Sequence, residues 1–544
     1  MFKPDPQARL TPSRCAAAVA LWAATLPVQA VELSSPDAEL KLRWDNTLKL
    51  STAARLKSVD ASLVVGNPNA DDGDRNFGKG LISQRLDLLS EFDARYKQFG
   101  LRVSAAGWYD ATYNRRNDND SPATANTSPS NQFSRVTRRM HGRDAEVLDA
   151  FVAVNDKVAE LPFTLRAGQH AMTWGETLFF GANGLIGQMV PLDLIKAASV
   201  PNTQIKEFMR PVPMLSGQLQ LTPEATLGAY YQLKWSPTLL PAAGSYFSSG
   251  EITQEGDEPW YFVGAHLADK KAKNGGQGGL QLRLRGSETD YGVYLLQSHS
   301  KFYKPVVVIG PTFAPIGYRL EYKENIKTFG LSASRSFGDI SWAAELSTRR
   351  GQDLASSINA DLSAALGGAP SSSDNPAYAV GNTLHLNTSV LWTLPRTPLF
   401  SEALLAAELA FNRVLRVTHN PVANGQAALD PNATRDSLAL RVSLEPTYRG
   451  VADGIDLSVP VGFGWAPGGS RSMALGPFAT PVNATGDMSL GAQLSMYDKW
   501  YVGLNYTHYL GKAAQATDPA TARFTYLQAL KDRDFISLSV RASF

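Results

Sequence analysis

The sequence has little of three features that mark common protein classes: cysteine, long apolar runs and charge of one sign. Cys15 is the single cysteine, which excludes a disulfide framework and a cysteine-ligated metal centre. No apolar run reaches the roughly 18 residues that a membrane-spanning helix needs, so a transmembrane helix is excluded. The formal net charge of +2 argues against a nucleic-acid partner. With 44% hydrophobic and 10% aromatic residues, the chain is nevertheless too apolar to be disordered.

The first 30 residues have the three parts of a secretory signal peptide. Lys3, Arg9 and Arg14 form a basic front, residues 15–26 form a short apolar core, and residues 28–30 form a small-x-small cleavage site. We predict that residues 1–30 are removed. The mature chain, residues 31–544, then carries 49 Lys+Arg (52 − 3) and 49 Asp+Glu (50 − 1), and it contains no cysteine. A buried N-terminal helix is the alternative.

From residue 39 onward the sequence alternates with a period of two. Between residues 39 and 56, apolar side chains occupy most even positions and charged or polar ones most odd positions. Successive strand residues point to opposite faces, so this pattern predicts a strand with one apolar and one charged face. It is far longer than the five or six residues of an average soluble strand. The same alternation recurs at residues 85–96, 101–114, 280–285, 437–445 and 487–496.

The last strand resembles the recognition strand of outer-membrane barrels. Ile536, Leu538, Val540, Ala542 and Phe544 stand at alternate positions up to the end of the sequence. Such a strand is read by the barrel-assembly machinery, which we therefore expect as a partner. An apolar outer face in contact with outer-membrane lipid and a polar lumen is what a membrane barrel requires. An ordinary edge strand, or a soluble sandwich with its apolar face inside, is the alternative.

Eighteen segments have strand character, and long and short connections alternate between them. The predicted fold is therefore all-β, a transmembrane antiparallel β-barrel of about 18 strands located in the outer membrane. Sixteen strands is the alternative, because 162–171 and 213–222 could belong to an inserted segment. The predicted strands are 38–57, 81–97, 100–114, 145–156, 162–171, 213–222, 225–235, 277–286, 290–300, 326–336, 339–349, 380–393, 402–417, 434–447, 453–465, 484–497, 500–511 and 534–544.

Residues 163–213 break the alternation and are too apolar for an exposed outer loop. Irregular backbone is tolerated at membrane depth when it is buried in protein or lines a wet cavity, so residues 172–212 are predicted to form a plug in the lumen. Charged residues would latch this plug to wall residues such as Arg43, Asp45, Arg95 or Arg283. The predicted latch residues are Arg166, Glu176, Asp193, Lys206, Glu207 and Arg210. The predicted substrate path along the plug consists of Trp174, Leu185, Ile186, Met189, Val190, Leu192 and Leu194.

Several motifs together resemble a proteobacterial outer-membrane family catalogued as domain of unknown function 1302. They include Trp174-Gly175-Glu176, Pro191-x-Asp193, Lys206-Glu207, residues 211–213, residues 230–235, residues 71–77, residues 244–248, and residues 330–332 followed by Glu345. The resemblance covers nearly the whole mature chain. It implies an outer-membrane location, a neighbouring exporter of the proton-driven RND type, and a link to alkanes, sterols and lipids.

No catalytic residue, metal ligand or cofactor is assigned. The sequence has no H-E-x-x-H pair and no G-x-S-x-G elbow. Residues 67–74 resemble a calcium loop, but Gly73 is out of register and Lys79 stands where the closing glutamate belongs. We therefore expect a solvated outer loop there, with weak binding of divalent ions left open.

The expected function is passive transport of hydrophobic small molecules through a barrel that the plug gates. A general porin for polar solutes is the first alternative, because the inserted segment could equally be a constriction loop. The second alternative is an outer-membrane partner of an RND-type lipid transport system, and an enzyme is the most distant reading.

Overall fold

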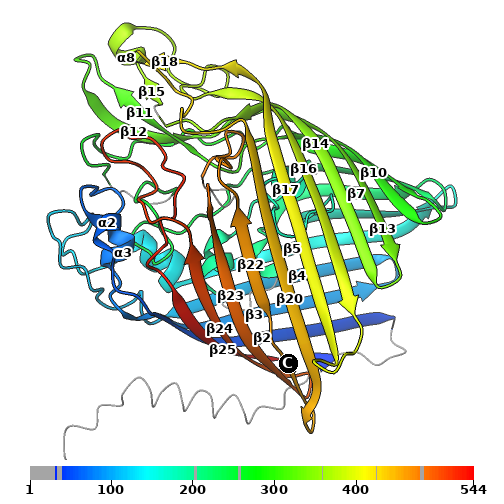
Figure 1. Cartoon of the computed structure of the whole chain (residues 1–544). Helices are drawn as coiled ribbons and strands as arrows, with labels where there is room; N and C mark the ends of the chain where they lie inside the picture. Colours follow the sequence, from blue (N-terminus) through cyan, green and yellow to red (C-terminus); the bar gives the residue numbers. More distant parts are fainter. Residues whose placement is uncertain are drawn as a thin grey trace, which may run out of the picture.

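A computed structural model gives the architecture for residues 31–32, 39–200, 205–254, 259–357, 359–423, 425–477 and 483–544. The chain forms a closed antiparallel β-barrel with eighteen strands around the ring (Figure 1). The predicted signal peptide, residues 1–30, lies outside the described residues. No helix in the described ranges is long and apolar enough to cross a membrane.

All eighteen predicted strand segments are strands of the ring, and the sixteen-strand alternative is wrong. The ring strands are β2 (Leu40–Arg55), β3 (Gly80–Tyr96), β4 (Phe99–Asp110), β5 (Arg143–Val158), β6 (Leu161–His170), β7 (Val212–Gln220), β8 (Ala225–Gln232), β9 (Gln277–Arg285), β10 (Thr289–Ser298), β13 (Ile326–Phe337), β14 (Ile340–Asp353), β16 (Val380–Leu394), β17 (Glu402–His419), β20 (Asp436–Ala452), β21 (Ile455–Ser458) with β22 (Val461–Ala466), β23 (Thr485–Met496), β24 (Trp500–Leu510) and β25 (Phe535–Ser543).

The first and last ring strands close the barrel. β2 pairs with β25 from Thr47↔Ser543 to Arg55↔Phe535. The amide of Phe544 donates to the carbonyl of Asn46 at 2.8 Å, so the pairing continues to the last residue. β1 (Val31–Glu32) pairs with β2 beyond this point. Closure leaves no unpaired edge in the ring, which a sheet in lipid requires.

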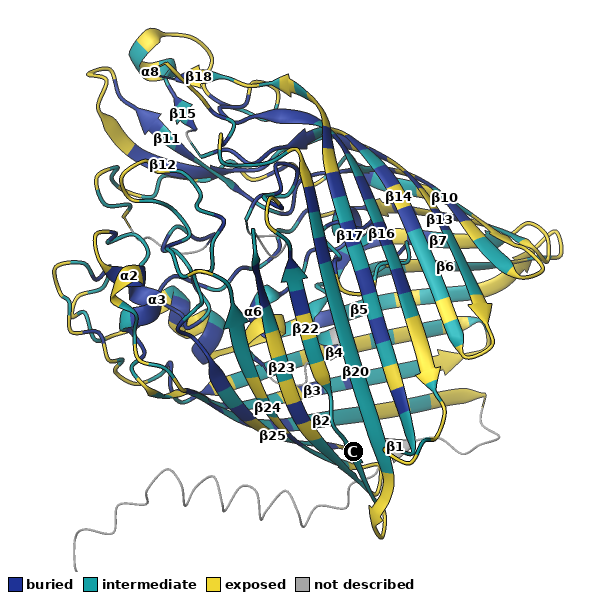
Figure 2. Ribbon diagram, viewed as in Figure 1, coloured by how far each residue is buried: buried dark blue, intermediate teal, exposed yellow. Residues whose placement is uncertain are grey.

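The period of two in the sequence becomes an inside and an outside of the wall. Outward side chains such as Leu88 and Leu280 are 44% and 53% exposed, whereas inward Glu345 and Glu408 are 3% and 1% exposed. The alternation is visible along the strands in Figure 2. An apolar exterior around a polar interior identifies the barrel as a transmembrane one.

One predicted strand is interrupted. Residues 453–465 form β21 and β22, which both pair with β20 on one side and β23 on the other, and so share one place in the ring. The break lies at Val459-Pro460, because proline has no N–H to donate to the ladder. Val459 still donates to the carbonyl of Pro446, so the wall stays continuous.

The long connections gather at one end of the barrel, opposite the end where the C-terminus lies (Figure 1). They carry short elements and three apolar clusters that form an outer layer over the lumen. These elements are α2 (Ala61–Val64), α3 (Asp72–Arg75), α4 (Arg135–Thr137), the π-helix η1 (Arg138–Gly142), β11 (Lys304–Ile309), β12 (Pro315–Glu321), β15 (Ala360–Asp361), α8 (Ser363–Leu366), β18 (Val422–Ala423) and β19 (Gln426–Ala427).

The expectation of a solvated loop at residues 67–74 is wrong. Asp71, Asp72 and Asp74 are 0%, 5% and 1% exposed, and residues from other loops bond to the first two. Elsewhere in the outer layer Trp235 is buried, packs against Tyr322 and donates from Nε1 to the carbonyl of Ser300.

Candidate functional site

The connection between β6 and β7, residues 171–211, contacts the inner wall of the barrel and is the plug. It contains α5 (Ile186–Met189), α6 (Leu194–Ser199) and α7 (Ile205–Phe208). Its first half, residues 172–190, contacts inner faces of wall strands from β7 to β20. Its second half, residues 191–200 and 205–211, contacts the outer layer and forms ion pairs with β2 and β5, and Met209 packs against the apolar cluster of the first half.

A single wall carboxylate, Glu345 of β14, holds two turns of the first half. One oxygen accepts from the amide of Glu176 at 2.7 Å. The other accepts from the amide of Leu185 at 2.8 Å and the hydroxyl of Thr177 at 2.7 Å. Gly175 and Gly184 lie so close to this carboxylate that a Cβ would fall 2.3 Å and 2.6 Å from its oxygens. The chain therefore needs glycine at these positions to wrap around Glu345.

Two further wall residues hold the backbone between those turns. Glu408 of β17 accepts from the amides of Phe179 and Phe180, the second at 2.9 Å. Arg349 of β14 donates to the carbonyls of residues 182–184, with its shortest bond to Asn183 at 2.6 Å. Charge-assisted bonds of this kind are stronger than neutral ones, and they do not depend on the plug's own side chains.

An apolar cluster completes the anchor of the first half. Trp174, Leu185, Met189 and Val190 are at most 4% exposed and pack against wall residues of β7, β8 and β10. Trp174 meets the ring of Tyr230 edge to face at 5.1 Å between centroids. These four residues of the predicted substrate path are buried between the plug and the wall, and Ile186 packs beside them.

Two lysine–glutamate ion pairs join the second half of the plug to the wall. Lys196 on α6 lies 2.5 Å from Glu146 of β5, and Glu207 on α7 lies 3.5 Å from Lys49 of β2. Asp193 caps α6 by accepting from the amide of Lys196 at 2.9 Å. Burial raises the pKa of Asp193, and the charge of Lys196 opposes that shift.

The remaining predicted latch residues lie apart from one another. Arg210 donates to Ser236 and to the carbonyl of Pro237 in the outer layer, each at 3.2 Å. Arg166 belongs to β6, and its guanidinium lies 5.6 Å from the ring of Phe151. Glu176 is close enough to Arg283 to feel its charge, although burial raises the pKa of Glu176 overall. The side chain of Lys206 lies outside the described residues. Of the other suggested wall partners, Arg43 and Asp45 pair with each other at 2.7 Å.

A cavity of about 1070 Å³ lies beside the second half of the plug. Its outer part is bordered by the loops of the outer layer, with Phe247, Trp260 and Phe262 in the lining. Leu194 and Phe208 of the plug line it from one side. Leu194 is thus the predicted path residue that faces this space, whereas Leu192 bonds through its backbone to Thr238 and Leu239 of the outer layer.

The inner part of the cavity runs along wall strands β20 and β23 to β25. Arg441 of β20 and Asp487 of β23 form an ion pair at 3.1 Å there, and both line the cavity. Arg441 also lies 5.9 Å from the ring of Phe179, so the cavity borders the anchored half at this point. Asn505, Thr507 and Ser537 of β24 and β25 continue the polar lining.

The residues that hold the anchor were not among the sequence-predicted site residues. Glu345, Arg349 and Glu408 stand on the inward phase of long strands, as many charged wall residues do. Glu345 was noted as part of a family motif, which was the one signal that could have marked it. The pairing of each with a backbone segment more than 150 positions away has no trace in local periodicity.

Comparison with known proteins gives solved barrels with little sequence identity. OccAB3 of Acinetobacter baumannii is 9% identical, with a TM-score of 0.42 over 92% of this chain and 99% of that one. OpdK of Pseudomonas aeruginosa, solved with vanillate, is 11% identical, with a TM-score of 0.40 over 92% and 98%. OmpT, an outer membrane protein of Vibrio cholerae, is 10% identical, with a TM-score of 0.36 over 95% and 100%. Scores below 0.5 carry no argument about function.

No curated protein matches the sequence. The resemblance noted in the motifs is confirmed over nearly the full length, since a family model matches residues 11–544. The chain belongs to the family described as "Protein of unknown function (DUF1302)".

Proposed function

We propose that this protein is a passive outer-membrane channel for hydrophobic small molecules of the lipid, alkane or sterol type, gated by the second half of the plug. The observation that carries the proposal is the 1070 Å³ cavity between the outer layer, the second half of the plug and wall strands β20 and β23 to β25. Ligand pockets for small molecules are commonly about 300–1,000 Å³, so a molecule of this class fits.

The lining of the cavity supports an apolar ligand at the entrance. Phe262, which is 89% exposed, lines the cavity together with Phe247 and Trp260. Apolar area removed from water contributes about 25 cal/mol per Å², so an alkyl chain or ring system gains free energy on entering. Passage is passive, and the ligand moves down its own concentration gradient.

The difference between the two halves of the plug supports the gate. Ala197 and Ala198 on α6 are exposed toward the cavity, whereas Leu185 in the first half is 0% exposed. A movement of α6 and α7 alone would widen the cavity without disturbing the bonds to Glu345, Arg349 and Glu408.

Planar-bilayer recording of the refolded barrel tests the ligand class. Decanoate and gluconate carry the same charge but differ in apolar surface. We expect decanoate to reduce the conductance at concentrations at least tenfold lower than gluconate. Equal effects of the two anions would overturn the proposed ligand class.

An exposed phenylalanine at the entrance has a matched control elsewhere in the outer layer. Phe262 lines the cavity, whereas Phe313, which is 60% exposed, lies in the β11–β12 turn outside that lining. Both have positive φ, 70° and 62°. We expect Phe262→Ser to weaken decanoate block about tenfold, equivalent to about 1.4 kcal/mol of apolar burial, and Phe313→Ser to leave it unchanged.

A general channel for polar solutes is the second candidate, and the Arg441–Asp487 pair with its polar neighbours favours it. In that case gluconate would carry current, decanoate would not block selectively, and Arg441→Gln would shift the ion selectivity. The bilayer experiment therefore separates the two candidates.

A further inference from the structure

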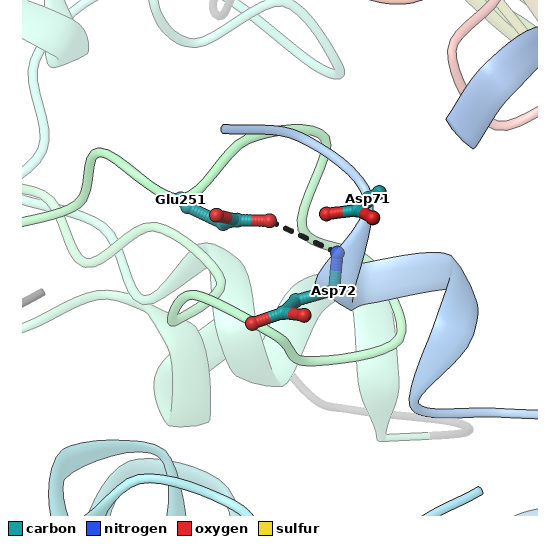
Figure 3. Close-up of side chains that lie close together, drawn as sticks. All are labelled: Asp71, Asp72 and Glu251. Atoms are coloured by element: carbon teal, nitrogen blue, oxygen red, sulfur yellow. Dashed lines mark hydrogen bonds between the residues drawn. The ribbon is translucent and has the colours of Figure 1, made fainter. Parts of the chain in front are cut away.

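Three acidic side chains from two outer connections meet under the surface of the outer layer. Asp71 and Asp72 come from the β2–β3 connection, and Glu251 comes from the β8–β9 connection (Figure 3). One carboxylate oxygen from each lies within 4.8 Å of the others. Calcium binds oxygen ligands at about 2.3–2.6 Å, so the ligands of one ion lie up to about 5 Å apart. The spacing fits a shared ion.

The three carboxylates are buried. Asp71, Asp72 and Glu251 are 0%, 5% and 4% exposed. Arg75 donates to Asp71 at 2.5 Å and offsets one of the negative charges. Asp74, two positions after Asp72, is not part of the cluster. It lies between the guanidinium groups of Arg55 and Arg533. Burying like charges this close together costs free energy that a cation among them would recover.

One oxygen of the cluster has no hydrogen-bond partner. Oδ2 of Asp71 accepts from Arg75 and from the hydroxyl of Thr124 at 2.7 Å, but Oδ1 is fully buried and accepts from no described group. The carboxylate of Asp71 faces that of Glu251 in Figure 3. A buried, unsatisfied anionic oxygen is costly, and it points to a ligand in the space it faces.

A neutral oxygen lies at the same place. Asn126, from the β4–β5 connection, donates from Nδ2 to Glu251 and from its backbone amide to Asp72 at 3.1 Å. Its side-chain oxygen Oδ1 is also buried without a hydrogen-bond partner. Asparagine carbonyl oxygens are common calcium ligands, so Asn126 can supply a fourth protein ligand to an ion bound by the carboxylates.

The backbone around the cluster is fixed by close packing. A Cβ on Gly73 would fall 2.5 Å from the carbonyl of Ser248, so α3 packs directly on the loop that carries Glu251. Glu251 also donates from its amide to the carbonyl of Asn69 at 3.0 Å and accepts from the amide of Asp72 at 2.9 Å. The ligand geometry is thus set by three connections packed against one another.

We propose that Asp71, Asp72, Glu251 and Asn126 form a calcium site that joins these three connections. All four ligands offer hard oxygen atoms. Arg75 offsets one of the three carboxylate charges, and the charge of a divalent ion balances the other two. Residues 66–70 and 247–253 line the entrance of the cavity, so the ion holds that entrance in shape. Binding of the ion does not depend on the proposed transport function.

Terbium luminescence tests the site in the full chain refolded in detergent without lipopolysaccharide. Tb³⁺ binds calcium sites and is excited through a nearby phenol, and Tyr261 is close enough to sense the charges of Glu251, Asp72 and Asp71. We expect saturable Tb³⁺ emission from one ion bound per chain. Added Ca²⁺ should abolish this emission because it competes for the same site. Asp71→Asn combined with Glu251→Gln should weaken Ca²⁺ binding at least tenfold.

A matched control separates the site from general surface charge. Asp361 is 4% exposed and lies in the same outer layer, but Arg319 binds its carboxylate. Asp361→Asn should leave Ca²⁺ binding unchanged. Equal binding by the double variant and the wild type, or no saturable binding by the wild type, would overturn the proposal.

Thermal unfolding gives a second readout for variants that fold poorly. A ligand that binds the folded state raises its unfolding temperature as the ligand concentration increases. We expect Ca²⁺ to raise the unfolding temperature of the wild type and of Asn126→Asp, which keeps an oxygen ligand, and to have a smaller effect on Asn126→Leu. Equal shifts in Asn126→Asp and Asn126→Leu would contradict the assignment of Asn126.

Discussion

The two halves of the plug are held by different chemistry. In the first half, wall carboxylates and a wall guanidinium bond to the plug backbone, as at Glu345, Glu408 and Arg349. In the second half, ion pairs of Lys196 with Glu146 and of Glu207 with Lys49 join the plug to the wall. Hydrogen bonds to the backbone fix the path of the chain. A lysine ion pair lies at the end of a long side chain and therefore restricts the position of the backbone less. One peptide segment can thus be bonded through its backbone in one half and through side-chain ion pairs in the other.

The largest expected effect comes from removing the central anchor. Glu345→Ala leaves the amides of Glu176 and Leu185 without their acceptor. It also removes the carboxylate of Glu345, whose charge stabilises the buried guanidinium of Arg349. Breaking a buried charged network of this kind costs about 3–5 kcal/mol. We expect the first half to leave the wall, with a steady, severalfold larger single-channel conductance.

The control for that experiment keeps the shape of the side chain. Glu345→Gln retains one carbonyl oxygen as an acceptor and should give a smaller rise in conductance than Glu345→Ala. Heat-modifiable migration of the folded barrel on gels shows that the ring itself is intact. An unchanged conductance in Glu345→Ala with an intact ring would mean that Glu345 does not anchor the plug.

The next largest effect is expected at Arg349, which holds carbonyl groups rather than amides. Arg349→Met removes the donor to the carbonyls of Asn183 and Gly184, at about 1.5–3 kcal/mol for bonds to a charged group. We expect faster proteolysis of residues 172–190 in folded protein. Arg349→Lys keeps the charge but replaces the planar fork of the guanidinium by a single ammonium nitrogen, so its cleavage rate should fall between those of Arg349→Met and the wild type.

The ring was predictable from sequence because lipid imposes a strict rule on each strand. A strand with lipid on one side and a wet lumen on the other must alternate apolar and polar residues. Segments such as Leu40–Arg55 can therefore be identified from the local sequence alone. Local rules fail where a single proline interrupts a ladder, as at Pro460. They also fail in the outer layer, where β11, β12 and β15 form a separate small sheet that the sequence did not indicate.

The site was less predictable because its contacts join distant segments. The apolar composition of residues 172–212 indicated an inserted segment, but not which face of it would meet the wall. Trp174 and Leu185 are apolar because they anchor the plug, and the same composition would suit a ligand path. Likewise, Asp71 and Asp72 looked like an incomplete calcium loop, since Glu251 and Asn126 come from other connections.

A smaller effect is expected where the second half meets the wall. Lys196→Met removes the ion pair with Glu146, in which the two side chains are 7% and 24% exposed. A partly exposed pair contributes about 1 kcal/mol, which corresponds to about a fivefold change in the ratio of open to closed time. Single-channel records should show more frequent openings with the closed level unchanged. A permanent open level would contradict the separation between anchor and gate.

Cysteine labelling sharpens the same comparison without changing any wall residue. In the mature chain, which contains no cysteine, Ala197→Cys places a thiol at the cavity, and Val190→Cys places one where the native side chain is 2% exposed against the wall. We expect a charged thiol reagent added from the outside to label position 197 and to leave position 190 unmodified in folded protein. Lys196→Met should speed labelling at 197 about twofold to fivefold. Labelling of both positions at equal rates would show that the first half is not fixed.

The smallest effect is expected at Lys49. Its side chain is 2% exposed, so it is more buried than Lys196 of the other lysine–glutamate pair, which is 7% exposed. Its Nζ lies 3.5 Å from Glu207, has no hydrogen-bond partner among the described groups, and has lost most of its hydration. Desolvation of a buried ammonium opposes the attraction to its partner, so replacement by an apolar side chain of similar length is often close to neutral. We expect Lys49→Met to change the ratio of open to closed time by no more than about twofold, or about 0.4 kcal/mol. A change of tenfold or more would mean that this pair, rather than the Lys196–Glu146 pair, holds the gate closed.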